Sequence, residues 1–264
     1  MVLRVIDLTL KGGIKVELKD RVVIVTGSAK GLGKAIAEKC FAEGAKLALW
    51  DVAEDGVKAL AKQLDKTGRK AKAFGVDITD EKSVNDAMAK TVKAFKRVDV
   101  LVNNAGISQH KKIEDMTLEI FERVMKVNVT GTFLCCKAAV PVMKAQKFGK
   151  IVNIASLGAR TGRPGVGINY AASKSAVIGI TQTLARELGP DGIYVNAICP
   201  GPILTEQTKQ YPPEVFASWN VGRAILKDGL PEDVADSVVF LASDRSAWIT
   251  GVTLDVNGGI LIRG

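Results

Sequence analysis

The chain has 264 residues, of which 47% are hydrophobic and 25% are charged, which is the composition of a folded globular protein and excludes disordered and collagen-like classes. Its 37 lysines and arginines outnumber 28 aspartates and glutamates, giving a formal net charge of +9. The lysines are spread over many segments and only 5% of residues are aromatic, so we expect a solvated basic surface and no nucleic-acid partner. No apolar run approaches the ~20 residues of a membrane-spanning helix, which predicts no membrane partner.

The cysteines and the single histidine indicate the compartment. Cys40, Cys135, Cys136 and Cys199 form no CxxC pair, and with only His110 beside them they cannot complete a zinc site, so we expect no metal. Adjacent cysteines are poorly placed for a disulfide, and Cys40 and Cys199 lie in apolar contexts that favour burial. The N-terminus lacks the continuous apolar core of a signal peptide. These features predict a reduced, cytoplasmic protein.

Residues 1–20 are predicted to be an N-terminal appendage, separate from a catalytic domain over 21–264. Apolar and polar residues alternate on both sides of Gly12-Gly13, which is typical of a β-hairpin. Beyond it, seven apolar runs have the character of strands buried on both faces. They are Val22–Thr26, Lys46–Trp50, Ala71–Val76, Val98–Asn103, Lys150–Ala155, Ile193–Ile198 and Val252–Val256.

Helical periodicity separates these runs. Leu32, Ile36 and Cys40 recur every four residues, as do Val177, Thr181 and Ala185. Alternation of strand and helix predicts an α/β fold, a single doubly wound domain with a seven-stranded parallel sheet. The longest irregular stretch, about 200–230, is the expected lid. Its aromatic residues either close over a site or pack a surface helix on the core; they are Tyr211, Phe216 and Trp219.

A glycine-rich turn joins the first predicted strand to the first helix. Gly27, Gly31 and Gly33 follow Thr26 directly, with Lys30 and Leu32 between them. Glycine permits a tight turn and close approach of backbone to a pyrophosphate, which the free N–H groups of the helix N-terminus then bind. The spacing is G-x-x-x-G-x-G and not the G-x-G-x-x-G of the dinucleotide fingerprint, so the flanking strand and helix carry the prediction.

Asp51 favours NAD over NADP as the cofactor. It closes the second strand, near the ~20 residues after the glycines at which an acid binds the adenosine ribose hydroxyls. A carboxylate there repels a 2′-phosphate, and the next residue is Val52 and not an arginine. Lys30 is the opposing signal, because a lysine in the glycine loop can reach a 2′-phosphate. We weigh Asp51 more heavily.

Tyr170 and Lys174 lie four residues apart at the start of a predicted helix, so their side chains share a face. A free phenol has a pKa of about 10 and is a poor base at neutral pH. An ammonium nearby, and a positively charged nicotinamide, favour the phenolate and lower this pKa. We therefore expect Tyr170 to exchange a proton with an alcohol or carbonyl.

These motifs, taken together, resemble the short-chain dehydrogenase/reductase family over residues 21–260. The shared motifs, in chain order, are Thr26-Gly27-x-x-x-Gly31-x-Gly33, Asn103-Asn104-Ala105-Gly106, Asn128, Ser156, Tyr170-x-x-x-Lys174, Pro200-Gly201-x-x-x-Thr205 and Asn257-Gly258-Gly259. The resemblance implies a Rossmann fold, hydride transfer between NAD(H) and a secondary alcohol or ketone, and a homotetramer with helices around 117–145 and 170–188 paired across subunits. Two departures are a loop from Ser156 to Tyr170 about one residue longer than usual and the N-terminal appendage.

The resemblance also implies roles for single residues. Ser156 would bind the substrate oxygen, Tyr170 would be the acid/base, and Lys174 would hold the nicotinamide ribose. Asn128 would anchor a water that relays protons through Lys174. The remaining expected cofactor contacts are Asn104, Ala105 and Gly106 beside the adenosine ribose, Asp77 with Ile78 at the adenine, and Pro200, Gly201, Ile203 and Thr205 near the carboxamide.

Two other functions stay open at this point. One is a 3-oxoacyl-thioester reductase that uses NADPH, against which Asp51 argues. The other is a non-catalytic nucleotide-sensing or RNA-binding protein on the same fold, which a complete set of Asn128, Ser156, Tyr170 and Lys174 disfavours. Arg160 and Arg163 offer a further hypothesis, in which they orient an acidic substrate.

Overall fold

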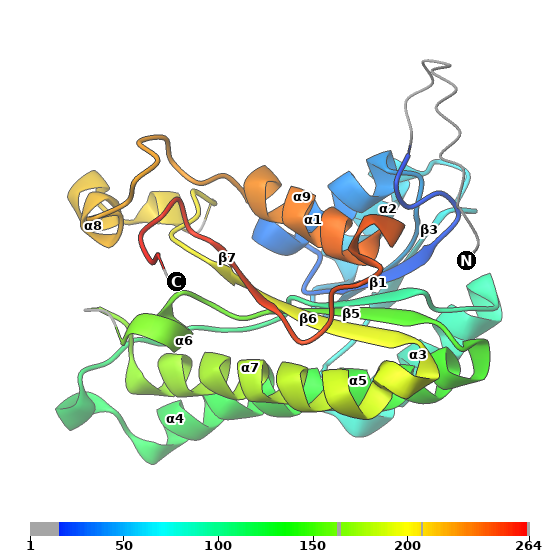
Figure 1. The fold of residues 1–264 in the computed structure, drawn as a ribbon, viewed down its shortest axis with the longest axis horizontal. Coiled ribbons are helices and arrows are strands. Elements are labelled where there is room, and N and C mark those ends of the chain that lie inside the picture. The colour runs from blue at the N-terminus through cyan, green and yellow to red at the C-terminus, as the bar shows by residue number, and fades with distance from the viewer. Residues whose placement is uncertain (1–15, 163–164, 207, 263–264) are drawn as a thin grey trace, which may run out of the picture.

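A computed structural model describes residues 16–162, 165–206 and 208–262. Its seven strands form one parallel sheet in the order β3-β2-β1-β4-β5-β6-β7 (Figure 1). Each predicted strand is confirmed, with ends shifted by up to two residues; the predicted hairpin falls mainly on residues 1–15, outside the described part. The strands are β1 Val22–Thr26, β2 Lys46–Asp51, β3 Ala71–Gly75, β4 Val100–Asn103, β5 Gly149–Ile154, β6 Ile193–Pro200 and β7 Thr253–Val256.

Helices cover both faces of the sheet, as a doubly wound fold requires (Figure 1). One layer holds α1 Gly31–Ala42, α2 Glu54–Leu64 and α9 Pro231–Ala242. The other holds α3 Glu81–Phe95, α4 Leu118–Met125, a π-helical turn Lys126–Thr130, α5 Gly131–Gln146 and α7 Ile168–Leu188. The short helices α6 Gly158–Thr161 and α8 Pro213–Trp219 lie in the connections.

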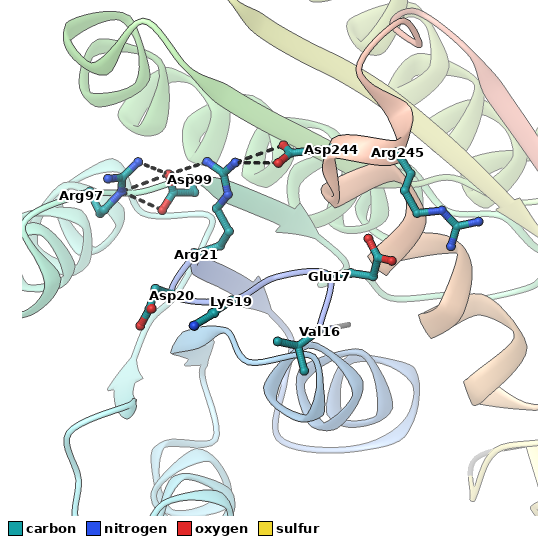
Figure 2. A pocket seen from close by; sticks show the side chains of 9 residues that line it. All are labelled: Val16, Glu17, Lys19, Asp20, Arg21, Arg97, Asp99, Asp244 and Arg245. Atoms are coloured by element: carbon teal, nitrogen blue, oxygen red, sulfur yellow. Dashed lines mark hydrogen bonds and ion pairs between the residues drawn. The ribbon is translucent and has the colours of Figure 1, made fainter. Parts of the chain in front are cut away.

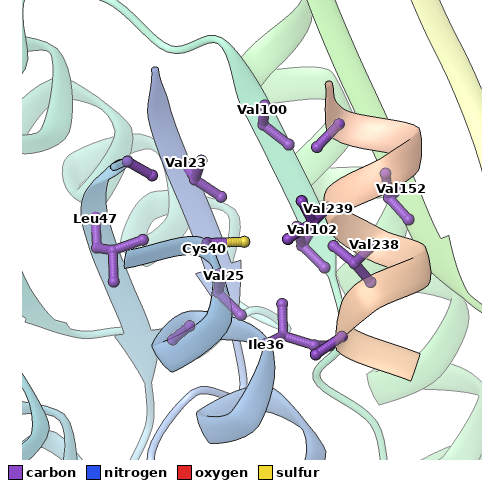
Figure 3. Packing of buried hydrophobic residues seen from close by; sticks show 14 of the residues in the cluster. Val23, Val25, Ile36, Cys40, Leu47, Val100, Val102, Val152, Val238 and Val239 are labelled. Atoms are coloured by element: carbon purple, nitrogen blue, oxygen red, sulfur yellow. The ribbon is translucent and has the colours of Figure 1, made fainter. Parts of the chain in front are cut away.

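The central strands β1, β4 and β5 are buried along their whole length because both of their faces are covered. Val23 and Val25 of β1 face α1 and α9, where they pack with Ile36 and Val238 (Figure 3). Ile24, the residue between them, packs into the opposite layer. All five are 0% exposed. Full burial of each such side chain contributes about 1.5–3 kcal/mol, which holds the strands and hence their carboxyl ends in place.

The irregular stretch 200–230 contains α8 and a single 3₁₀ turn, Thr208–Gln210, among its described residues. Its aromatic residues pack on one another: the Trp219 ring lies 5.0 Å from that of Tyr211 and 6.0 Å from that of Phe216. The indole nitrogen of Trp219 also comes within 3.9 Å of the place a Cβ on Gly165 would occupy. This cluster therefore stands beside the loop that leads to Tyr170.

Lys150 is a buried charge inside the sheet layer. It is 2% exposed, and its Nζ donates to the Ser243 carbonyl at 2.6 Å and the Ser246 hydroxyl at 2.7 Å. Burial lowers the pKa of Lys150 to about 8. An unfolded lysine has a pKa near 10.4, so between these values the unfolded chain binds more protons and folding stability rises with pH.

We therefore expect wild-type protein to gain up to about 3 kcal/mol of unfolding free energy from Lys150 between about pH 8 and 10.5. Lys150→Met should lose this gain, because the thioether side chain does not titrate. Urea unfolding of both proteins at pH 7.5 and 10 measures the difference, and comparison of the two cancels other titrating groups. Equal pH dependence in both proteins would show that Lys150 is already neutral or solvated.

Candidate active site

The predicted site residues gather at the carboxyl edge of the sheet. Between β1 and β4 the order of the strands reverses, which is where doubly wound sheets open a crevice for ligands. Thr26 ends β1, Asn103 ends β4 and Pro200 ends β6, and the loops that follow carry Gly27, Asn104 and Gly201. Ser156 follows β5 by two residues. Four separate motifs therefore meet at one edge because parallel strands all end there.

The glycine loop has the geometry predicted for it. Gly27 has a φ of +65°, and a Cβ there would lie 2.8 Å from the Ala105 Cα. A Cβ on Gly33 would collide with the Gly27 carbonyl oxygen and lie 2.5 Å from the amide nitrogen of Asn104. Helix α1 begins at Gly31 with no side-chain cap, so its first N–H groups stay available to a ligand.

Asn104 connects the glycine loop with the loop that follows β4. Its Nδ2 donates to the carbonyls of Thr26 at 2.9 Å and Gly27 at 3.1 Å. The Thr26 hydroxyl accepts from the backbone N–H groups of Asn104 and Ala105, each at 3.0 Å. The loops after β1 and β4 are thus held as one unit, and Asn104 acts on the glycine loop itself.

Asp51 ends β2 beside the glycine loop. Its carboxylate accepts from the backbone N–H of Ala29 at 3.0 Å through Oδ2 and of Ala53 at 2.9 Å through Oδ1. These two bonds fix the orientation of the carboxylate, and the side chain remains partly exposed. Each carboxylate oxygen accepts more than one hydrogen bond, so lone pairs remain for ribose hydroxyls. Lys30 and Val52 are exposed on either side.

Lys174 and Tyr170 both project from the first turns of α7. The Lys174 Nζ donates to the Ile154 carbonyl of β5 at 2.7 Å and lies 5.9 Å from the centroid of the Tyr170 ring. Lys174 is 5% exposed, and burial lowers its pKa to about 8. The prediction that both side chains share a face of the helix is confirmed.

The predicted depression of the Tyr170 pKa involves both Lys174 and a bound nicotinamide, and the ligand-free protein does not show it. Burial raises the pKa of Tyr170, and a hydrogen bond with the Ser156 side chain opposes this only in part. The physical reason is desolvation, because burial disfavours the charged phenolate. A depressed pKa thus requires charge that is brought in with the ligand.

Asn128 is fully buried in the π-helical turn between α4 and α5. Its Oδ1 accepts from the Ile107 N–H at 2.8 Å, and its Nδ2 donates to the Ile107 carbonyl at 2.9 Å and the Ser173 hydroxyl at 3.0 Å. A Cβ on Gly106 would lie 3.1 Å from the Asn128 Oδ1 and 3.4 Å from the Lys174 Nζ. Asn128 therefore ties the loop after β4 to α7, beside Lys174.

The remaining residues expected to contact the cofactor lie in different surroundings. Asp77 accepts from the backbone and side chain of Thr79, both at 2.8 Å, and is exposed. Ile78 is buried against Gly131. Gly201 is pressed against Asn257, with 2.9 Å from its Cβ position to the Asn257 Cα. On the same edge, Ile203 bridges to Gly229 and Thr205 bonds Thr208.

Three further residues lie near the site, of which only Asn169 had no role suggested by the sequence. His110 contacts Tyr170 edge-on, with ring centroids 5.4 Å apart. Asn169 is 0% exposed and its Oδ1 accepts from the Tyr170 N–H at 2.7 Å. Arg160 pairs with Asp255 at 3.2 Å and donates to the Thr253 carbonyl at 3.1 Å, so it ties α6 to β7. The hypothesis that Arg160 orients an acidic substrate is therefore disfavoured.

A pocket of about 520 Å³ lies at the opposite, amino-terminal edge of the sheet (Figure 2). Asp99 lines it and is 0% exposed. Its Oδ1 forms ion pairs with the guanidinium groups of Arg97, at 2.6 Å, and Arg21, at 3.6 Å. Arg21 also bonds Asp244 at 3.0 Å. None of the expected site residues lines this pocket, and its charges neutralise one another, so we assign the cluster a structural role.

The described residues also bear on a metal site and on a membrane-spanning helix. Over the described ranges, no cluster of three or more histidine, cysteine, aspartate or glutamate side chains is arranged to hold a metal ion. Within the same residues, no helix has the length and apolarity needed to cross a membrane.

The sequence is similar to those of known proteins over most of its length. A family model described as enoyl-(acyl carrier protein) reductase matches residues 27–261. The 3-oxoacyl-[acyl-carrier-protein] reductase FabG of Aquifex aeolicus is 38% identical over 94% of this chain and 100% of its own length. The 3alpha-hydroxysteroid dehydrogenase of Mediterraneibacter gnavus is 38% identical over 91% of this chain and 97% of its own.

A solved structure has the same fold. The crystal structure of gox2181 superposes with a TM-score of 0.89 at 34% sequence identity, covering 93% of this chain and 97% of that one. Sequence, topology and site geometry agree. The chain belongs to the short-chain dehydrogenase/reductase family and is an oxidoreductase of hydroxyl and keto groups.

Proposed function

We propose that this protein is an NAD-preferring dehydrogenase of secondary alcohols, or reductase of the matching ketones, with Tyr170 as its acid/base. The observation that carries the proposal is the meeting of Tyr170, Ser156 and Lys174 at the carboxyl edge of the sheet. Asn128 connects α7 with the loop after β4, and Asp51 stands at the ribose end of the glycine loop. The glycine loop fits a dinucleotide, because α1 begins at Gly31 with no side-chain cap and its first N–H groups can bind a pyrophosphate.

In this proposal the bound nicotinamide supplies the hydride chemistry, and the chain supplies positions and protons. The Ser156 hydroxyl donates to the substrate oxygen and stabilises the negative charge that develops there. The phenol of Tyr170 gives its proton to that oxygen in reduction and takes it back in oxidation. Lys174 lies beside Tyr170 and holds the nicotinamide ribose. Asn128 orders the water through which protons reach Lys174.

The cofactor preference depends on Asp51 and is tested by Asp51→Ala. We expect the variant to bind NADH about tenfold more weakly, because charge-assisted hydrogen bonds of this kind contribute ~1.5–3 kcal/mol. NADPH should bind more tightly than to the wild type, because a repelling carboxylate is gone. Fluorescence titration with both cofactors measures this, and Asp55→Ala on the nearby surface of α2 is the control. Unchanged selectivity in Asp51→Ala would contradict the assignment.

A 3-oxoacyl-thioester reductase that uses NADPH is the second candidate. The Aquifex aeolicus relative is a 3-oxoacyl-[acyl-carrier-protein] reductase, which favours this candidate, and Lys30 is exposed in the glycine loop. The name of the hydroxysteroid dehydrogenase relative favours a secondary alcohol instead. A screen of both cofactors against polyols, hydroxy acids, cyclic alcohols and acyl thioesters separates the two. Salt-dependent RNA binding with no turnover on this panel would instead support a non-catalytic protein.

We also propose a cytoplasmic homotetramer acting on a small-molecule substrate. Large apolar side chains are exposed on the helices expected to pair across subunits: Leu118 on α4, Phe133 on α5 and Ile168 on α7. Burial of these side chains between subunits would remove them from water. The four cysteines are all free and buried, which supports a reducing compartment. Residues 21–264 would form the catalytic domain and 1–20 its appendage.

A further inference from the structure

His110 is the single histidine of the chain. It lies in the loop that follows β4 and contacts the loop that precedes α7. Its Nδ1 accepts a hydrogen bond from the backbone N–H of Gly167 at 3.0 Å. Its ring meets the ring of Tyr170 nearly at right angles, 82°, with centroids 5.4 Å apart. One side chain therefore contacts both the end of the Ser156–Tyr170 loop and the proposed acid/base.

The backbone on the Gly167 side of this contact is closely packed, while His110 itself is exposed. A Cβ on Gly167 would lie 3.1 Å from the His110 Cα and 3.3 Å from the Lys111 nitrogen. The buried Asn169 donates from Nδ2 to the Gln109 carbonyl at 3.0 Å. Residues 109–110 and 167–169 are thus joined by two hydrogen bonds, one to a side chain of each segment.

The Gly167 bond defines the protonation state of the ring. An imidazole nitrogen that accepts from a backbone N–H carries no proton, so the neutral ring has its proton on Nε2. Protonation of Nδ1 would place one N–H against another and break the bond. The contact therefore exists only while His110 is neutral.

We propose that His110 is a positioning residue: its neutral ring holds the Ser156–Tyr170 loop and the Tyr170 ring in the geometry that receives substrate, and protonation releases them. This inference rests on the proposed function, since it concerns the same site. It adds a residue that acts on substrate binding through Gly167 and Tyr170, without itself taking part in hydride or proton transfer.

The pH at which release occurs follows from the groups around the ring. Tyr170 is the titratable group that α7 presents to it, Lys111 and Lys112 follow it in its own segment, and Gly165, Val166, Gly167 and Ile168 carry no ionisable group. Burial of the ring lowers the pKa of His110 below its ordinary value of 6.5. We therefore expect kcat/KM to fall on the acid side, at a pH below 6.5.

Two substitutions separate the hydrogen bond from the ring contact. His110→Asn places an amide oxygen near the position of Nδ1 and keeps the acceptor, whereas His110→Phe keeps the ring and loses the acceptor. For His110→Phe we expect KM to rise about tenfold with little change in kcat, because the Gly167 N–H is left unsatisfied. His110→Asn should restore most of this loss and should lack the acid limb. Equal KM in wild type and His110→Phe would overturn the inference.

A measurement without turnover keeps this test separate from the proposed function. Because the chain has one histidine, ¹⁵N-histidine labelling gives a single pair of ring nitrogen signals. We expect an unprotonated Nδ1 and a protonated Nε2 at pH 8, with a titration midpoint below 6.5. The opposite tautomer, or a midpoint at 6.5, would overturn the inference. If the wild type turned over no alcohol or ketone, the proposed function would fail while these signals still reported on the Gly167 contact.

Discussion

Tyr170→Phe is expected to lower kcat by about 10²–10⁴-fold while NADH binds within about threefold of wild type. The substitution removes one hydroxyl from a partly buried ring. The ring contacts with His110 and Lys174 can persist, so the loss falls on proton transfer and not on binding. Without the phenol, the substrate oxygen has no group beside it that can both donate and accept a proton.

Steady-state kinetics and NADH fluorescence titration measure the two parts of this prediction. Tyr194→Phe is a matched control, because Tyr194 also loses only a hydroxyl and packs on Lys150, within the sheet layer. Turnover of Tyr170→Phe close to that of the control would refute the acid/base role. A parallel loss of NADH affinity would mean that the hydroxyl is needed to build the cofactor site.

Gly33→Ala is expected to weaken dinucleotide binding at least tenfold. The new methyl group would meet the Gly27 carbonyl and the Asn104 amide, both of which are held by the hydrogen bond between them. Neither can retreat without breaking that bond, so the glycine loop must move away from α1. The N–H groups that should bind a pyrophosphate would then no longer converge.

Gly189→Ala serves as the matched control, since no atom lies within 4 Å of a Cβ at Gly189 and its φ is −53°, which any residue adopts. It should fold at least as well as wild type and bind NADH normally. Thermal unfolding of both variants distinguishes a displaced loop from a lost fold. Normal NADH affinity in a stable Gly33→Ala protein would contradict the role assigned to this loop.

The strands and the site edge could be predicted from the sequence because their signals are local. Val22–Thr26 and Lys150–Ala155 are nearly continuous apolar runs, which predicts strands that are covered on both faces of a sheet. Tyr170 and Lys174 share a helix face by their spacing alone. The same local logic placed Gly27 and Asp51 at neighbouring strand ends, where both are found.

The pKa shifts of the site residues and their hydrogen-bond partners were decided only by the tertiary structure. Burial, which raises the pKa of Tyr170, depends on side chains brought together from β5, β6 and α7 and has no local signature. The Lys174 ammonium bonds the Ile154 carbonyl, 20 residues away, and His110 meets Gly167 at a separation of 57. Composition and periodicity specify which faces are buried, but hydrogen-bond partners across loops are set by how the packed layers bring those loops together.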